Sequence, residues 1–302
     1  MTLYSPILSF FRILPMSLWL LFGYFLQLFV NSFARHYFFN SYRLFFRGLV
    51  SIFGIKIKIS GNISKKNTLF VCNHISYLDI LVLGSKVNAI FVAKSEIDSW
   101  PLINRFTSVG KTIFVSRKDK TAIKDQMILI EKRLKDNYSV ILFPEGTSSD
   151  GLNVLPFKSS LLGIIEKKNM MDYYLQPITL SYNKLDGIPV DLKYRPFLAW
   201  FGAMDLFSHA WKFLGLGRCE VDLNFHKPLK FSDFSNRKVA SEYAFKLISG
   251  QILRNNNSKE VKRTFDMLNS NIWDNSCYTN NIKSCFTLPV MFLDKKFRSP
   301  RQ

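Results

Sequence analysis

The sequence is poor in cysteine, histidine and acidic residues. It has four cysteines and four histidines in 302 residues, and it lacks the paired C-x-x-C motifs of structural zinc sites. Cys72 lies in an apolar run, where a reduced and buried thiol is expected. Acidic residues number 22 against 41 lysines and arginines, which gives a formal net charge of +19. This excess favours an anionic partner: a nucleic acid, an anionic membrane surface or an acidic substrate.

Several catalytic and binding patterns are also missing. No G-x-S-x-G sequence is present, which argues against a serine hydrolase. The "GKT" at residues 110–112 is not a P-loop, because Arg105 occupies the position of the required upstream glycine. The aromatic residues are mostly phenylalanines in apolar runs, without the interleaved basic residues typical of a nucleic-acid interface.

A long uncharged stretch lies near the N-terminus. No charged residue occurs between Ile13 and Ala34, and about 20 such residues are enough to cross a bilayer as a helix. The residues that follow are basic and aromatic, which is typical of a membrane interface, and the positive-inside rule places them on the cytoplasmic side. Pro15 and Gly23 interrupt the stretch, so a re-entrant hairpin that never crosses is the alternative. We interpret residues 1–60 as a membrane anchor with interfacial helices.

Strand-like and helix-like stretches alternate from about residue 61. Short runs rich in β-branched and aromatic residues include "TLFVCN", "AIFVAK", "TIFVSR", "SVILF", "YLQPITLSYN" and "EVDLNF". Residues 120–137 instead have apolar positions at helical spacing, and a further helical stretch ends near residue 255. This alternation predicts an α/β domain over residues 61–256, with a mostly parallel sheet flanked by helices. Residues 257–302 are polar, and we expect them to form a loosely ordered tail.

The stretch "VCNHISYLD" has a histidine at the end of a predicted strand and an aspartate five positions later. In parallel α/β sheets, sites form where strands end and helices begin. Asp79 could accept the Nδ1 proton of His74 and leave Nε2 to take a proton from a substrate hydroxyl. The alternative is structural: Ser76 and Asp79 match a helix capping box. The pattern is short enough to arise by chance, so it leaves both interpretations open.

The stretch "FPEGTSSDGLNVLPFK" follows another predicted strand. Gly146 permits a tight turn, Thr147 offers a hydroxyl, and Lys158 follows further on, a combination able to hold an anion. Upstream, Arg117 ends an apolar run and could bind a phosphate through two hydrogen bonds. The alternatives are a polar loop and a solvated basic turn.

The order of these motifs, together with "LQPITL", resembles the glycerophospholipid acyltransferase family. The resemblance covers roughly residues 60–245 and is greatest to bacterial 1-acylglycerol-3-phosphate acyltransferases. It implies the fold of glycerol-3-phosphate acyltransferases. It also implies transfer of a fatty acyl group from a thioester to the sn-2 hydroxyl of 1-acylglycerol-3-phosphate (lysophosphatidate), which yields phosphatidate for phospholipid synthesis.

The resemblance also implies roles for individual residues. It makes His74 the general base and Asp79 the carboxylate that orients it. The other matching positions are expected to bind substrate: Arg117, Glu145, Gly146, Thr147 and Lys158 at the acceptor, and Pro177 near the acyl donor. Ser148 stands where many members carry arginine, and some lyso-ornithine-lipid acyltransferases share this stretch. Another lysolipid, such as lyso-ornithine lipid, is therefore the alternative acceptor.

The expected partners follow from this resemblance. They are the lipid bilayer, a lysophospholipid acceptor, and acyl-CoA or acyl carrier protein as the co-substrate, with no metal, no nucleic acid and no other cofactor. The expected location is the bacterial cytoplasmic (inner) membrane, with the catalytic domain on the cytoplasmic side. The alternative from a different class is a non-enzymatic basic protein that binds membranes or nucleic acid, and the net charge of +19 motivates it.

Overall fold

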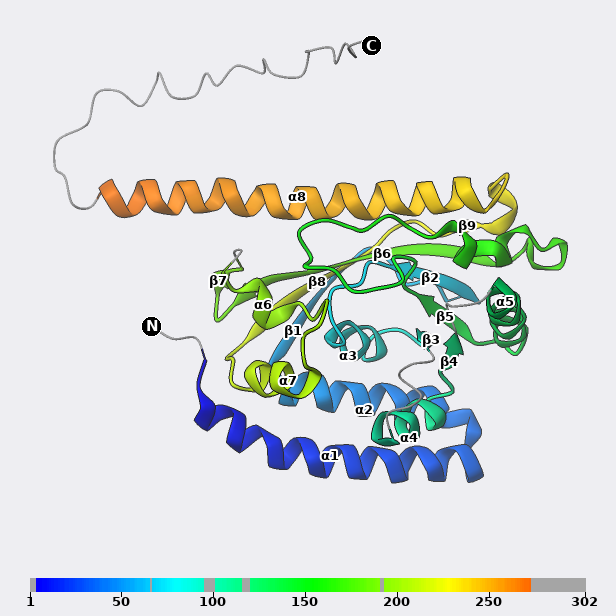
Figure 1. Ribbon diagram of the computed structural model, residues 1–302, viewed down its shortest axis with the longest axis horizontal. Helices are drawn as coiled ribbons and strands as arrows, with labels where there is room; N and C mark the ends of the chain where they lie inside the picture. The colour runs from blue at the N-terminus through cyan, green and yellow to red at the C-terminus, as the bar shows by residue number, and fades with distance from the viewer. Residues whose placement is uncertain (1–3, 66, 95–100, 116–119, 191–192, 273–302) are drawn as a thin grey trace, which may run out of the picture. The chain divides into compact units, whose positions relative to one another are not determined.

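The computed structural model describes residues 4–65, 67–94, 101–115, 120–190 and 193–272. Residues as far as Asn257 form one compact unit, and the residues after it form a second. The first unit contains the sheet and the helices packed on it (Figure 1).

The helices and strands follow the predicted alternation. The α-helices are α1 (Pro6–Phe33), α2 (Phe38–Ile52), α3 (Leu78–Gly84), α4 (Pro101–Val109), α5 (Lys120–Lys135), α6 (Arg195–Leu198), α7 (Leu206–Leu214) and α8 (Arg237–Ile272). The 3₁₀ helices are η1 (Arg35–Tyr37), η3 (Ser159–Glu166), η4 (Lys168–Met170) and η5 (Phe231–Asp233). The strands are β1 (Ile55–Ser60), β2 (Thr68–Cys72), β3 (Ala89–Lys94), β4 (Ile113–Val115), β5 (Ser139–Leu142), β6 (Tyr174–Leu185), β7 (Ile188–Pro189), β8 (Cys219–Phe225) and β9 (Leu229–Lys230).

The strands of the described chain form one mixed sheet in the order β1-β8-β6-β2-β5-β3-β4, with β7 and β9 also paired to β6. The run from β6 to β4 is parallel throughout, and β8 is antiparallel to β6 but parallel to β1. All residues of β2 are buried, as expected for a parallel strand covered on both faces. The predicted α/β fold with a mostly parallel sheet flanked by helices is therefore confirmed.

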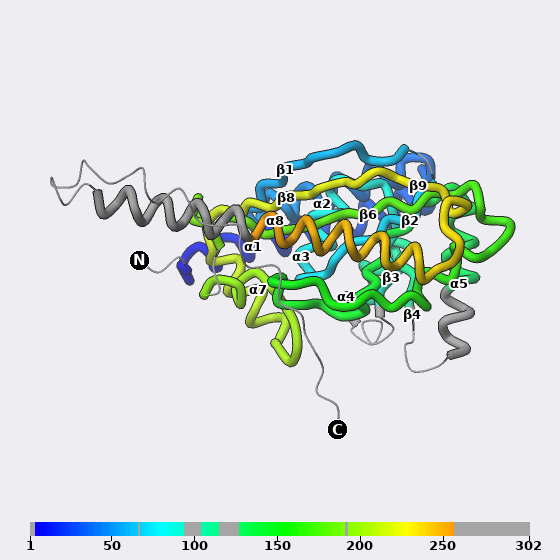
Figure 2. Tube along the Cα trace, turned by 90° about the horizontal axis from the view of Figure 1, so that it is seen from above, coloured from blue at the N-terminus to red at the C-terminus, as the bar shows by residue number. Residues whose placement is uncertain are grey.

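Helices cover both faces of the sheet. Figures 1 and 2 show the first part of α8 along one face, with α2, α3 and α7 on the other. Four residues of α8 at a spacing of four are buried in the core: Ala240, Ala244, Ile248 and Ile252. The helix continues to Ile272, past the predicted end near residue 255. The added segment has no glycine or proline to stop it, so its polarity alone was a poor guide to where the helix ends.

The N-terminal residues form a hairpin of two helices, α1 and α2. The single helix α1 runs through Pro15 and Gly23, so the chain reverses after Phe33 rather than at either of these residues. Gly23 lies against the ring of Phe45, and the Trp19 indole donates to the Phe45 carbonyl at 2.9 Å. Helix α1 therefore packs closely on α2 along its middle.

Helix α1 is also bound to the rest of the compact unit at both ends. Near its start, the Arg12 guanidinium donates to the carbonyls of Leu214 and Leu216 at 3.0 and 2.6 Å. Near its end, the Asn31 amide donates to the Val109 carbonyl at 2.9 Å. The opposite face leaves apolar side chains exposed: Ile7, Phe10, Phe11, Leu14, Leu18, Leu21, Phe22, Phe25, Phe29 and Phe33. An apolar face of this length is consistent with membrane association.

Candidate active site

The segment that leaves β2 carries the predicted histidine and is held to β6 by its first residue. The Asn73 side chain accepts from the Leu180 N–H at 2.8 Å and donates to the Leu180 carbonyl at 3.0 Å. Asn73 thus continues the pairing of β2 with β6 by one residue after the strand ends. Sequence reasoning missed this residue, because its partner lies more than a hundred positions away.

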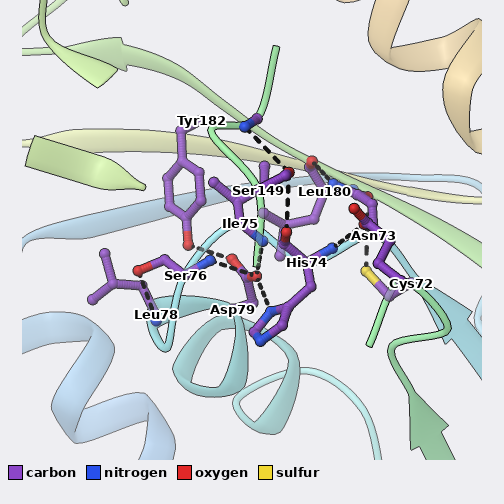
Figure 3. Close-up of polar contacts among 12 residues, drawn as sticks. Cys72, Asn73, His74, Ile75, Ser76, Leu78, Asp79, Ser149, Leu180 and Tyr182 are labelled. Atoms are coloured by element: carbon purple, nitrogen blue, oxygen red, sulfur yellow. Dashed lines mark hydrogen bonds and ion pairs between the residues drawn. The ribbon is translucent and has the colours of Figure 1, made fainter. Parts of the chain in front are cut away.

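His74 and Asp79 are in direct contact (Figure 3). The His74 Nδ1–H donates to Asp79 Oδ2 at 2.8 Å, and the same oxygen accepts from the N–H groups of Ile75 and Ser76 at 2.7 and 3.0 Å. The bond from Ser76 is one half of a capping box, so the structural and dyad interpretations coexist at this carboxylate. The other oxygen, Oδ1, accepts from the Tyr182 hydroxyl at 2.7 Å. Asp79 is completely buried, and these donors stabilise its charge.

The imidazole of His74 is fixed in orientation but still accessible. Its ring stacks on Phe143, with centroids 4.2 Å apart and 19° between the planes. The side chain is 19% exposed, and within the described chain no hydrogen bond occupies Nε2. In the neutral imidazole, a hydrogen bond from Nδ1–H to a carboxylate fixes the tautomer in which Nε2 carries no proton, which is the form a general base requires.

Glu145 lies behind His74. One of its carboxylate oxygens accepts from the His74 N–H at 2.7 Å and the other from the Leu155 N–H at 2.9 Å. Only 2% of the residue is exposed, and this burial raises the pKa of Glu145 to about 7 although the two N–H groups oppose the shift. Its position suits a role in holding the backbone of His74, and the acceptor contact expected from the sequence stays a prediction.

An apolar cavity of about 490 Å³ opens at His74. It extends between the α1–α2 hairpin, α3, β3 and α4, and its far part is lined by residues such as Gly23, Gln27, Tyr42 and Gly110. At the His74 end the lining includes Gly146, Thr147, Ser148 and Trp200. Its volume lies in the range of ordinary ligand pockets, and an almost wholly apolar lining suits a hydrocarbon chain.

The other expected site residues lie in different places. Gly146, with φ 76°, forms the tight turn after β5 that the sequence predicted, and it lines the cavity together with Thr147. Lys158 is exposed, and its N–H donates to the Pro144 carbonyl at 2.9 Å. Pro177 is buried within β6 beside Val71 of β2, away from the cavity lining. Arg117 lies outside the described residues.

The arrangement combines a histidine, a buried carboxylate that orients it and an apolar cavity that the histidine lines. Such a site can deprotonate the hydroxyl of an apolar substrate bound in the cavity. No group of three or more potential metal ligands of the His, Cys, Asp or Glu type occurs within the described residues.

Comparison with known proteins identifies the family. The family model described as "Acyltransferase" matches residues 54–181, which include the β2 and β5 motifs. The lyso-ornithine lipid O-acyltransferase of Rhizobium meliloti (strain 1021) is 34% identical over 195 residues, covering 63% of this chain and 67% of that protein. The protein of the same name from Brucella abortus (strain 2308) is 32% identical over 200 residues, covering 65% of this chain and 75% of its own length.

A solved structure has a similar fold. The 1-acyl-sn-glycerophosphate (LPA) acyltransferase PlsC from Thermotoga maritima aligns with a TM-score of 0.61 and 19% sequence identity. The alignment covers 82% of this chain and 94% of that structure. The fold, the matched motifs and the extent of the sequence similarity agree, and the chain belongs to the acyltransferase family.

Proposed function

We propose that this protein is a membrane-associated lysolipid O-acyltransferase that transfers a fatty acyl group from a thioester to a free hydroxyl of its acceptor. The observation that carries the proposal is the position of His74, bonded to Asp79 through Nδ1 and bordering the apolar cavity. A base at one end of a hydrocarbon-binding cavity suits a substrate that has a hydroxyl near the start of an acyl chain.

The reaction needs only proton transfer and positioning. Nε2 of His74 accepts the proton of the acceptor hydroxyl while its oxygen attacks the thioester carbonyl carbon, and Asp79 stabilises the imidazolium that forms. The tetrahedral intermediate collapses by breaking the carbon–sulfur bond and expels a thiolate. The imidazolium then gives its proton to that thiolate, so the histidine is regenerated. The acyl group passes directly to the acceptor, without a covalent acyl-enzyme.

Lyso-ornithine lipid is the acceptor that we place first. Two relatives carrying that name align over about two thirds of this chain, and Ser148 lines the cavity where many family members carry arginine. Loss of an arginine removes one positive contact for a phosphate. The second candidate acceptor is 1-acylglycerol-3-phosphate, which the motif resemblance and the name of the structural neighbour support.

The α1 helix lies in the plane of the membrane in our proposal, with its apolar face in one leaflet. By length and composition, this helix of 28 residues is able to cross a bilayer. However, Arg12 near its start and Asn31 near its end both donate to carbonyls of the same compact unit. A spanning helix would carry these two ends to opposite sides of a hydrocarbon layer about 30 Å thick. The in-plane placement keeps both contacts and brings the cavity to the lipid surface.

Depth measurements distinguish the two placements. Nitroxide labels at Phe11 and Phe29, both exposed on α1, are expected to lie at the same shallow depth in one leaflet. Labels at clearly different depths, with one on the far side of the bilayer, would rule out the in-plane placement.

The acceptor is tested with the full chain in lipid nanodiscs, acyl-CoA or acyl carrier protein thioesters, and a panel of lysolipids. We expect acylation of lyso-ornithine lipid, with slower acylation of lysophosphatidate. Arg117→Ala should slow only acceptors that bear a phosphate. Absence of turnover on every lysolipid with both donors, together with steeply salt-dependent RNA binding, would support the non-enzymatic alternative instead.

A further inference from the structure

Tyr182 on β6 makes a hydrogen bond that neither the motifs nor the dyad pattern predicts. Its hydroxyl donates to Asp79 Oδ1 at 2.7 Å, and Figure 3 shows the phenol pointing at the carboxylate from the opposite side to His74. Both residues are buried: Tyr182 is 4% exposed and Asp79 is fully covered. A hydrogen bond between a hydroxyl and a buried carboxylate is charge-assisted and stronger than a neutral one.

The two carboxylate oxygens of Asp79 accept different numbers of hydrogen bonds. Oδ2 accepts from His74 Nδ1 and from the N–H groups of Ile75 and Ser76. Among the described residues, Oδ1 has the Tyr182 hydroxyl as its one donor. The three Oδ2 bonds come from neighbours in the chain, whereas the Oδ1 bond comes from another strand. Removing the hydroxyl would leave a buried carboxylate oxygen without a donor.

The local geometry of β6 directs Tyr182 toward the site. The strand is aligned with β2 by backbone pairing and by the Asn73 bonds to Leu180. Its register with β8 shifts between Tyr182 and Lys184, so Asn183 is an extra residue. Bulges of this kind often lie beside active sites and change the direction of a side chain.

The phenol of Tyr182 stays protonated, and therefore remains a donor, near neutral pH. Burial and the neighbouring Asp79 raise the pKa of Tyr182 well above its usual value of 10. The other titratable groups near the pair are Tyr77 and Cys219, which bear on Tyr182, the buried Cys72, whose pKa burial and Asp79 raise, and Glu145 behind His74. Burial also raises the pKa of Tyr77 and Cys219, so both are neutral near pH 7.

We propose that Tyr182 is a positioning residue for acyl transfer: it fixes the Asp79 carboxylate and limits its basicity, so that His74 is correctly oriented and deprotonated. This inference rests on the proposed function, because it needs His74 to act as a base. It assigns a role to a residue of β6 that lies two positions after the "LQPITL" motif, and so outside the part of the strand that the resemblance associates with the acyl donor.

The test compares Tyr182→Phe with the wild type on whichever lysolipid the wild type acylates. We expect kcat to fall about 10-fold, by analogy with the loss seen when residues that orient metal ligands are removed. Without the hydrogen bond from the phenol, the negative charge of Asp79 is less well stabilised. The carboxylate then interacts more strongly with the protonated imidazole of His74, which favours the imidazolium. The acid limb of the kcat/KM profile should therefore move to higher pH by about half a unit or more.

A second variant moves the same limb in the opposite direction without removing the hydroxyl. Tyr182→3-fluorotyrosine makes the phenol a stronger donor, so we expect the acid limb to move to lower pH. Tyr243→Phe is the matched control, because Tyr243 of α8 packs on Phe234, which follows η5, and does not contact the dyad. It should change neither kcat nor the pH profile. Thermal unfolding of all variants reports any general loss of structure.

A double-mutant cycle tests whether Tyr182 acts through Asp79. With Asp79→Asn already present, Tyr182→Phe should have little further effect on kcat, since coupled residues are not additive. Additive effects, or a Tyr182→Phe enzyme with unchanged kcat and pH profile, would overturn the inference. If the wild type acylates no lysolipid, it is the proposed function that fails.

Discussion

Asp79 and the outer face of α1 differ in how much of their surroundings the chain itself provides. Asp79 is fully buried, and the chain supplies every donor that its carboxylate uses, from His74 to Tyr182. The outer face of α1 carries a row of phenylalanines, leucines and isoleucines that the chain leaves exposed. The first region is complete in the isolated protein, whereas the second needs an apolar environment to become complete.

This difference assigns catalysis to the region around Asp79 and membrane binding to the outer face of α1. A change near Asp79 should alter the rate and the pH dependence of the reaction, with the membrane affinity kept. A change on α1 should alter the membrane affinity, with the chemistry kept when the substrate is supplied in detergent. A variant in one region that changes both the reaction rate and the membrane affinity would show that the two regions are coupled through the cavity, which both α1 and His74 line.

The largest expected effect is that of His74→Ala. Loss of the base should lower kcat about 1,000-fold, within the range of general-base contributions. The rate of acyl transfer from a labelled thioester measures it. His226→Asn is a suitable control, because His226 bonds to Thr179 outside the cavity and should retain nearly full activity. An undiminished rate in His74→Ala would contradict the mechanism.

A smaller effect is expected for the pH dependence of stability in Glu145→Gln. The pKa of Glu145 is raised to about 7 from 4.5, mainly by burial. A raised carboxyl pKa contributes stability that is fully present below pH 4.5 and is lost as the pH rises through about 7. The wild type should therefore lose roughly 3 kcal/mol relative to the variant over this interval, since one pKa unit corresponds to about 1.4 kcal/mol.

Denaturant unfolding at pH 4.5 and pH 8 measures this difference. The quantity compared is the change in the free energy of unfolding between the two pH values within each protein. The glutamine of the variant cannot accept from both N–H groups, which destabilises the variant equally at every pH and cancels in this difference. An equal change in the free energy of unfolding between the two pH values for both proteins would contradict the prediction. It would mean that Glu145 is ionised over this range and that its two N–H donors stabilise the charge more than burial destabilises it.

Next in size is the membrane affinity of a triple variant of α1. Phe10→Ser, Phe22→Ser and Phe29→Ser together should weaken binding to vesicles about 30-fold, because buried apolar area contributes about 25 cal/mol per Å². Co-sedimentation with vesicles gives the affinity. Ile188→Ser, at an exposed apolar position on β7, should leave it unchanged. Full activity of the triple variant on detergent-dispersed substrate would confirm that the dyad is independent of α1.

The sequence predicted those features whose signals are local. The buried strand β2 is a continuous apolar run, and the short motif that follows it holds both His74 and Asp79, whose side chains share a hydrogen bond. Residues 120–137 keep helical spacing, which matches α5. Periodicity and short motifs record these features directly, so they can be read without the fold.

Features that depend on distant contacts were not predictable in this way. Asn73 and Tyr182 act through partners more than a hundred residues away, and nothing in their own neighbourhoods marks them. Likewise, the resemblance grouped Glu145 with the acceptor contacts, but its orientation toward the His74 N–H depends on how two loops pack. The bonds that tie both ends of α1 to the compact unit were equally hidden, so the crossing and re-entrant alternatives stayed open.

Lys158→Ala tests an exposed member of the expected substrate contacts. An exposed ammonium interacts through water, so we expect kcat/KM to fall only about 3-fold at low salt and the difference to vanish at high salt. Lys238→Ala, an exposed lysine at the start of α8, serves as the control for general loss of positive charge. A larger fall that persists at high salt, and only for phosphate-bearing acceptors, would mean that Lys158 swings into direct contact with the phosphate. In that case the acceptor site extends beyond the cavity, and lysophosphatidate becomes the better candidate acceptor.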